Sequence, residues 1–210
     1  ISLTYKNSDK CYFYKIFKAK IINLPDLSFN EIFSSKQCNP SSYTGGRIEI
    51  LNDNKQKKLL LTTYNADKDH LAQEDNSIFG KILIIDENNG EYEVFSKGHR
   101  NSIGLLFDDE NNVILNTENG PRGGDEINLI LRDKNYGWNV SSYGDNYKKK
   151  NLYIDTPDLK FDHEKLGFQE PIFSFVSSIG ISQIIKIDDN FSNYWNNNFL
   201  IGSLNSKHLY

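Results

Sequence analysis

The sequence GHRNSIG at residues 98–104, followed by ENGPRGGDEINLI at 118–130 and NYGW at 135–138, decides how the rest of this chain is interpreted. Short runs of branched apolar residues alternate here with loops rich in glycine, proline and asparagine. That alternation is typical of strands joined by tight turns, because these loop residues supply the backbone conformations that turns require. The stretch therefore predicts β-structure with polar loops.

The loop after residue 118 is the first candidate for chemistry. Gly120 and Pro121 force a tight turn whose backbone carbonyls can point together, and Asp125 and Glu126 follow with carboxylates. Hard cations such as Ca²⁺ take oxygen ligands of these kinds. An ordinary turn without a ligand remains the alternative, since Gly-Pro and Gly-Gly sequences are common in turns.

Arg100 and Asn101 are the second candidate feature. The guanidinium of Arg100 is a planar fork of donors that suits a carboxylate or a quinone oxygen, and the amide of Asn101 offers both a donor and an acceptor. A ligand with several acidic groups would fit such a lining. The alternative is that these two residues only stabilise a loop and bind no ligand.

Similar strand patterns extend in both directions from this stretch, with acidic or asparagine-rich turns between them. They predict an all-β domain, and both a β-propeller and a β-sandwich fit the spacing. The segment from 143 to 169 is polar and is expected to be a long loop. The short strand-like runs are at residues 47–51, 58–63, 81–85, 112–115, 126–130, 171–176, 183–187 and 199–201.

Composition bounds the possible partners. The 210 residues, 38% of them hydrophobic, suffice for one domain, and a net charge of −4 gives no basic surface for nucleic acid. No apolar run approaches the roughly 18 to 20 residues that span a bilayer. The start at Ile1 lacks a signal sequence and the chain contains no methionine, so we expect a mature or partial chain.

Two cysteines, Cys11 and Cys38, are too few for a disulfide framework and do not form a CxxC pair. Free or buried thiols are the favoured interpretation, with a single bridge in an oxidising compartment as the alternative.

The order GHRN, ENGPRGGDEIN and NYGW resembles the core motif of soluble glucose/sorbosone (aldose sugar) dehydrogenases that depend on pyrroloquinoline quinone (PQQ). Their usual forms are GHRNPQG, E-H/Q-GP-x-x-x-DEIN and NYGWP. Weaker similarity extends from residue 44 to 204, within a single domain of 1–210. The resemblance implies a six-bladed β-propeller, of which this chain would supply about four blades, and a periplasmic or secreted location.

The resemblance also assigns residues. It implies that Arg100, Asn101 and Asn119 contact PQQ and that the carbonyls of Gly120 and Pro121 hold the Ca²⁺ that binds and polarises the quinone.

A second, structural Ca²⁺ site is implied at Asp125, Glu126 and the carbonyl of Tyr136. Trp138 and His99 are expected to be structural residues.

Three positions depart from the family pattern. Tyr43 stands where the family has its catalytic histidine, and a tyrosine, which titrates near 10, is a poor base at neutral pH. Asn65 stands at the position of the supporting acid, a role that Asp67 or Asp69 would take if the loop shifts. Asn205 replaces a lysine that reaches PQQ in the family.

Two functions therefore remain open. The first is a PQQ- and Ca²⁺-dependent dehydrogenase that oxidises the anomeric carbon of an aldose to a lactone and passes electrons to a soluble acceptor. The second is a catalytically lapsed propeller that binds a sugar, a quinone or a protein, for which the three departures are the evidence.

Overall fold

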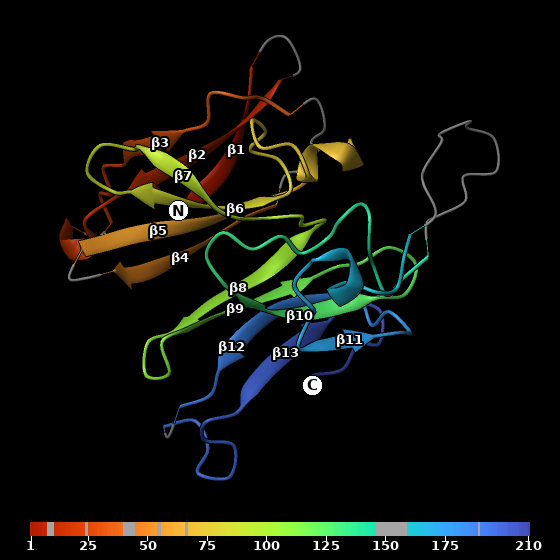
Figure 1. Ribbon diagram of the computed structural model, residues 1–210. Helices are drawn as coiled ribbons and strands as arrows, with labels where there is room; N and C mark the ends of the chain where they lie inside the picture. Colours follow the sequence, from red (N-terminus) through yellow and green to blue (C-terminus); the bar gives the residue numbers. More distant parts are fainter. Residues whose placement is uncertain are drawn as a thin grey trace.

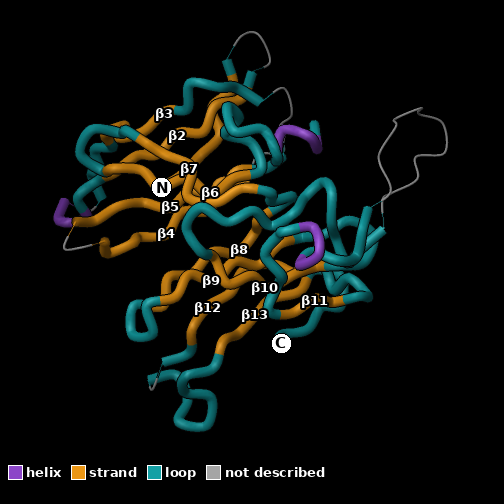
Figure 2. The backbone as a smooth tube through the Cα atoms, viewed as in Figure 1, coloured by secondary structure: helices purple, strands orange, loops and turns teal. Residues whose placement is uncertain are grey.

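The structure is a computed structural model, and it describes residues 1–7, 11–23, 25–39, 45–53, 56–65, 67–145, 159–188 and 190–210. Strands dominate these residues and form four separate antiparallel sheets (Figure 1). Three short 3₁₀ helices, drawn purple in Figure 2, interrupt the loops. They are η1 at Ile21–Asn23, η2 at Asp69–Ala72 and η3 at Glu164–Leu166.

The first two sheets come from the N-terminal part of the chain. The first has the order β1-β2-β3 and the second the order β4-β5-β6-β7. Their strands are β1 Ser2–Lys6, β2 Tyr12–Lys18, β3 Asn30–Ser34, β4 Gly45–Asp53, β5 Gln56–Thr63, β6 Lys81–Asp86 and β7 Tyr92–Lys97.

The third sheet has the order β8-β9-β10-β11, and the fourth pairs β12 with β13. Residues 143–169, expected to be a loop, contain only η3 among the strands and helices of their described part, and 146–158 lie outside the described residues. The strands of these two sheets are β8 Ser102–Asp108, β9 Val113–Glu118, β10 Asp125–Ile130, β11 Phe173–Phe175, β12 Ile181–Lys186 and β13 Phe199–Ser203.

The four sheets follow one another like blades. The first strand of each sheet contacts the first strand of the next, since β1 contacts β4, β4 contacts β8, and β8 contacts β12. Each sheet then continues outward from that strand by antiparallel pairing with its sequence neighbours. This is the arrangement of a propeller, and it confirms the predicted all-β propeller with about four blades over the sandwich alternative.

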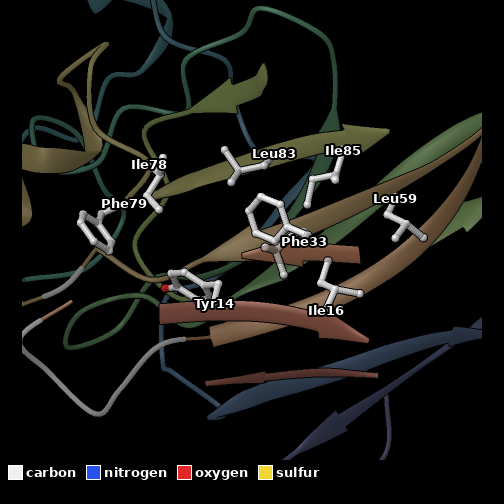
Figure 3. Close-up of a cluster of buried hydrophobic side chains, with 9 residues drawn as sticks. Tyr14, Ile16, Phe33, Leu59, Ile78, Phe79, Leu83 and Ile85 are labelled. Carbon is white, nitrogen blue, oxygen red and sulfur yellow. The ribbon is translucent and has the colours of Figure 1, made fainter. Parts of the chain in front are cut away.

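The second sheet is buried on both faces, which explains its sequence. Side chains alternate between the two faces of a strand, and Leu59 and Leu61 of β5 pack toward the first sheet while Leu60 packs toward the third. A strand covered on both sides needs apolar residues at every position, hence the unbroken runs at 59–61 and 82–85. Figure 3 shows the first cluster, where Tyr14, Ile16 and Phe33 meet the side chains of the second sheet.

Cys11 and Cys38 form a disulfide, so the favoured interpretation of free thiols is wrong. The residues next to them pair through two backbone hydrogen bonds, Tyr12 N–H to the Asn39 carbonyl at 2.9 Å and Asn39 N–H to the Tyr12 carbonyl at 2.8 Å. That pairing holds the two cysteine Cα atoms 5.4 Å apart, within the span of a disulfide. None of the helices in the described part of the chain is long and apolar enough to cross a membrane.

Candidate functional site

The segment that carries Arg100 lies between β7 and β8, and its backbone is fixed from two sides. Gly98 donates its N–H to the Ala72 carbonyl at 3.1 Å and accepts from the Trp138 N–H at 3.0 Å. It has a φ of +78°, and a Cβ there would lie 2.1 Å from the Asn135 side chain. Only glycine fits that position.

Glu118, at the end of β9, holds the same segment in place through its side chain. This buried carboxylate accepts the backbone N–H of Arg100 and contacts His99 Nδ1 at 3.0 Å. His99 Nε2 contacts the Ser96 hydroxyl at 2.9 Å. Since His99 is fully buried and both its nitrogens are bonded, its expected structural role is confirmed.

The guanidinium of Arg100 lies against the glycine-rich loop. Its Nη1 donates to the carbonyls of Asn119 and Gly120, each at 2.9 Å, and its Cζ lies 5.3 Å from the Trp138 ring centre, a cation–π contact. A Cβ on Gly120 would lie 2.0 Å from the Gly124 carbonyl, so this loop closes only without a side chain there. The structure thus brings together Arg100, Asn119 and Gly120, which the family resemblance assigned to one site.

Asn101 joins the same loop through its backbone. Its carbonyl accepts the N–H of Asn119 at 2.9 Å. The amide of its half-buried side chain has no hydrogen bond to another described residue and stays available to a ligand.

A cavity with room for about one water molecule or ion lies beneath Arg100. Glu118 and Glu126 both line it, and they are directly opposite each other on the paired strands β9 and β10. Burial, and then the neighbouring Glu118 carboxylate, raise the pKa of Glu126 well above its ordinary value. The full lining is Arg100, Glu118, Gly120, Pro121, Gly124, Glu126, Tyr136, Trp138, Ser141 and Ser142.

Asp125 is fully buried and is engaged by the backbone around it. One oxygen accepts from the Gly120 N–H at 3.1 Å and the Ser178 hydroxyl at 3.0 Å. The other accepts from the N–H groups of Gly180 at 2.8 Å and Ile181 at 3.0 Å. Its carboxylate therefore ties the glycine-rich loop to the start of β12 in the next sheet.

The side chains of Tyr136 and Trp138 belong to the core as well as to the cavity wall. The Tyr136 ring stacks on His99 with the ring centres 4.7 Å apart, and its hydroxyl donates to the Leu129 carbonyl at 2.6 Å. Trp138 is buried, as expected of a structural residue, but it also covers Arg100. The resemblance assigned the backbone carbonyl of Tyr136 to a calcium ion and gave its side chain no such role.

The chain just after β5 forms a second wall of the candidate site. Asn65 is buried, and its side-chain Nδ2 donates to Asp69 Oδ1 on η2. Its backbone N–H bonds the Arg100 carbonyl at 3.2 Å, which links this wall to the arginine segment. Tyr43, at the position of the family histidine, lies outside the described residues.

Asn205 follows β13 and is exposed. Its Nδ2 donates to the Ser178 carbonyl at 3.2 Å, and Ser178 in turn contacts Asp125. Through Ser178 and Asp125, the residue is therefore linked indirectly to the loop of Gly120.

The donor set of the loop fits a cation and an anionic cofactor. The Asn119 and Gly120 carbonyls converge on a positive group, and each retains a second lone pair for a metal ion. Both bonds go to Nη1, so Nε and Nη2 of Arg100 have no hydrogen-bond partner among the residues that the structure describes. In that same part of the chain, no group of three or more His, Cys, Asp or Glu side chains is placed to hold a metal.

Sequence reasoning gave no role to Glu118, although it faces Glu126 and supports Arg100. Two acidic residues, one before and one after a tight loop, are a signal that they face each other across a hairpin. The loop length, which sets that register, cannot be read from the residue types alone.

Comparison with known proteins identifies a family and several relatives of this chain. A sequence model of the family described as Glucose / Sorbosone dehydrogenase matches residues 18–210. Aldose sugar dehydrogenase YliI of Escherichia coli (strain K12) is 32% identical over 124 residues, which are 59% of this chain and 32% of that protein.

Two of the solved structures that share the fold are aldose sugar dehydrogenases. The soluble aldose sugar dehydrogenase of Escherichia coli in the apo-form has a TM-score of 0.82 at 23% identity, covering 99% of this chain and 62% of that one. The PQQ-bound aldose sugar dehydrogenase of Streptomyces coelicolor has a TM-score of 0.66 at 21% identity, covering 96% of this chain and 58% of that one. This chain thus spans less than two thirds of the length of these relatives.

Proposed function

This chain belongs to the glucose/sorbosone dehydrogenase family, and we propose that the protein is an oxidoreductase that oxidises the anomeric carbon of an aldose to a lactone with PQQ and Ca²⁺. The observation that carries the proposal is the convergence of the Asn119 and Gly120 carbonyls on the Arg100 guanidinium. The PQQ-bound structure of the Streptomyces coelicolor relative supports the choice of cofactor.

Arg100 would hold the cofactor with its free Nε and Nη2 donors, and Asn101 would add its amide. The carbonyls of Gly120 and Pro121 would hold the calcium ion, and Asn119 would complete the edge of the site. When bound, PQQ supplies a two-electron acceptor for the hydride of the sugar. Trp138 covers one face of the half-buried arginine, and such partial shielding from water would strengthen the charge interaction in the site.

A second calcium ion is proposed in the small cavity, where Glu126 and the Tyr136 carbonyl would be its ligands. A divalent cation there would relieve the cost of placing Glu126 opposite Glu118. Asp125 would contribute through the backbone that it fixes.

The proposed partners are a sugar and a soluble electron acceptor, and the proposed location is periplasmic or secreted. The Cys11–Cys38 disulfide supports that location, because such bridges persist in oxidising compartments.

Reconstitution with PQQ and Ca²⁺, followed by dye reduction over a panel of aldoses, tests the proposal. Arg100→Ala should weaken PQQ binding by about tenfold or more, since hydrogen bonds to a charged group contribute about 1.5 to 3 kcal/mol each. Arg132→Ala is the matched control, because Arg132 forms an exposed ion pair with Glu93. Failure of the protein to take up PQQ would refute the proposal.

The lapsed propeller remains the second candidate, favoured by Tyr43, Asn65 and Asn205. Tight PQQ uptake without turnover, restored by Tyr43→His, would support it over the active dehydrogenase.

A further inference from the structure

Oxidation of a sugar hydroxyl needs a proton acceptor, and this inference rests on the proposed function. The hydroxyl proton has to leave as the hydride leaves the same carbon, and a positioned carboxylate or imidazole is the usual acceptor. Two carboxylates near Arg100 are already engaged. Glu118 is bonded by His99 and the Arg100 N–H, and Asp125 accepts from four donors.

Asp69 differs from both. It opens η2, it is half-buried, and its Oδ1 accepts from the Asn65 amide. No described residue donates to its Oδ2 with hydrogen-bond geometry, although the Trp138 indole N–H lies close enough to act on the carboxyl. Oδ2 is thus able to contact a ligand.

The side chain also lies on the Arg100 side of the wall. The Arg100 guanidinium is close enough to lower the pKa of the Asp69 carboxyl. The buried indole N–H of Trp138 lowers it too, as a weak donor to the Asp69 carboxyl that lies outside ordinary hydrogen-bond geometry. Asp69 therefore faces the same two side chains that form the proposed cofactor wall.

The helical turn that carries Asp69 is held in place at its far end. Lys81 is fully buried and donates from Nζ to the carbonyls of Leu71 at 2.8 Å and Ala72 at 3.0 Å. The next residue, Gln73, exchanges side-chain hydrogen bonds with Asn135 at 2.7 and 3.1 Å. These bonds fix the turn to both neighbouring segments, so the position of Asp69 is defined by the fold.

The charges around Asp69 favour a proton acceptor over a permanent anion. Burial is the largest effect and raises the pKa of its carboxyl, Arg100 opposes it, and Asp67 raises it further. Tyr64, whose hydroxyl donates to Asp67 at 2.5 Å, is another titratable group on this wall. A carboxylate whose pKa lies above the ordinary range is a stronger base than an exposed one.

We propose that Asp69 is the catalytic residue that accepts the proton of the sugar's anomeric hydroxyl. Its neighbour Asn65 carries an amide and has no carboxylate that could accept this proton. The O–H bond breaks and its proton goes to Oδ2 of Asp69. The C–H bond of the same carbon breaks and its electron pair leaves as hydride to the quinone cofactor, which is reduced by two electrons. The carbon–oxygen double bond of the lactone forms, and Asp69, being half-exposed, returns its proton to solvent.

The test compares Asp69→Asn with Asp133→Asn in the protein produced from its natural gene and loaded with PQQ and Ca²⁺. Asp133 is the matched control because it is an exposed aspartate on a loop that has no part in the proposed site. Its φ of +63° is also one that asparagine tolerates. Asp69→Asn should lower kcat by about 10²- to 10⁴-fold and remove the acidic limb of the pH profile. Asp133→Asn should leave kcat within about threefold of the parent value and should keep the acidic limb.

Two readouts do not depend on turnover. Calorimetric titration with PQQ should give the Asp69→Asn protein a Kd within about threefold of the parent, because the residue acts on the sugar. Carboxyl carbon resonances, followed over pH without cofactor, should give Asp69 a pKa above the ordinary value of an aspartate.

The outcomes separate the two proposals. If the parent protein takes up no PQQ, the proposed function fails and this inference with it. If the parent turns over and Asp69→Asn retains kcat within about threefold, or loses PQQ affinity as much as it loses rate, Asp69 is not the proton acceptor while the dehydrogenase stands. Loss of rate with affinity retained and the acidic limb gone supports Asp69.

Discussion

Replacing Asp125 with asparagine should destabilise the fold strongly, although the two side chains have the same shape. The carboxylate accepts four hydrogen bonds, from Gly120, Ser178, Gly180 and Ile181. An amide keeps one acceptor oxygen and turns an NH₂ group toward two of those donors, so two bonds are lost. At about 1.5 to 3 kcal/mol for each bond to a charged group, the loss is about 3 to 6 kcal/mol.

Thermal unfolding followed by circular dichroism measures this loss. For a domain of this size 1 kcal/mol lowers Tm by about 2 to 4 °C, so Asp125→Asn should lower it by about 6 to 24 °C. Asp133→Asn is the matched control, because Asp133 is exposed on the same sheet's outgoing loop and its φ of +63° suits asparagine. Hydrogen exchange should also accelerate at the Gly180 and Ile181 amides. A loss below about 1 kcal/mol would refute the account of Asp125 as the tie between the loop and β12.

Three further predictions concern stability. Because burial and Glu118 raise the pKa of Glu126, the folded chain keeps a proton that the unfolded chain releases. Without calcium, the free energy of unfolding should therefore fall as pH rises above the ordinary glutamate pKa of 4.5, and Glu126→Gln should remove that slope in urea titrations. Reducing the Cys11–Cys38 bridge, which spans 27 positions, should cost about 3 to 4 kcal/mol in the same assay, and no change would contradict the pairing. Lys81→Met should cost about 3 kcal/mol or more, since Nζ bonds three carbonyls, and a neutral result would show that η2 is held by other contacts.

The strands could be predicted because the positions that are buried in a sheet require apolar residues. Residues 59–61 and 82–85 are apolar at every position since both faces of that sheet are covered. The choice between propeller and sandwich could not be made from the same pattern. Alternation reports which face of a strand is buried, and it does not report which sheet lies against that face.

The candidate site likewise has one part that the sequence predicts and another that it does not. Arg100, Asn119 and Gly120 are brought together by local hairpin geometry, which the motif specifies. The partners of Asp125 lie 55 and 56 residues further along the chain at Gly180 and Ile181, so no local pattern could indicate that its oxygens serve the backbone. The cysteine pair was missed for a similar reason, since strand pairing across residues 12–39 sets the distance between the sulfur-bearing residues.

The bond from Asp125 to the N–H of Ile181 also sets an order of assembly. Closing a loop of that length is slow compared with forming the hairpin of β9 and β10, whose contacts are local. During synthesis the hairpin can form before residue 181 has left the ribosome, but the turn at Gly120 acquires its final anchor only afterwards. The part of the molecule proposed to hold calcium is therefore expected to be among the last to mature, and a nascent chain should bind the ion only after the fourth sheet has docked.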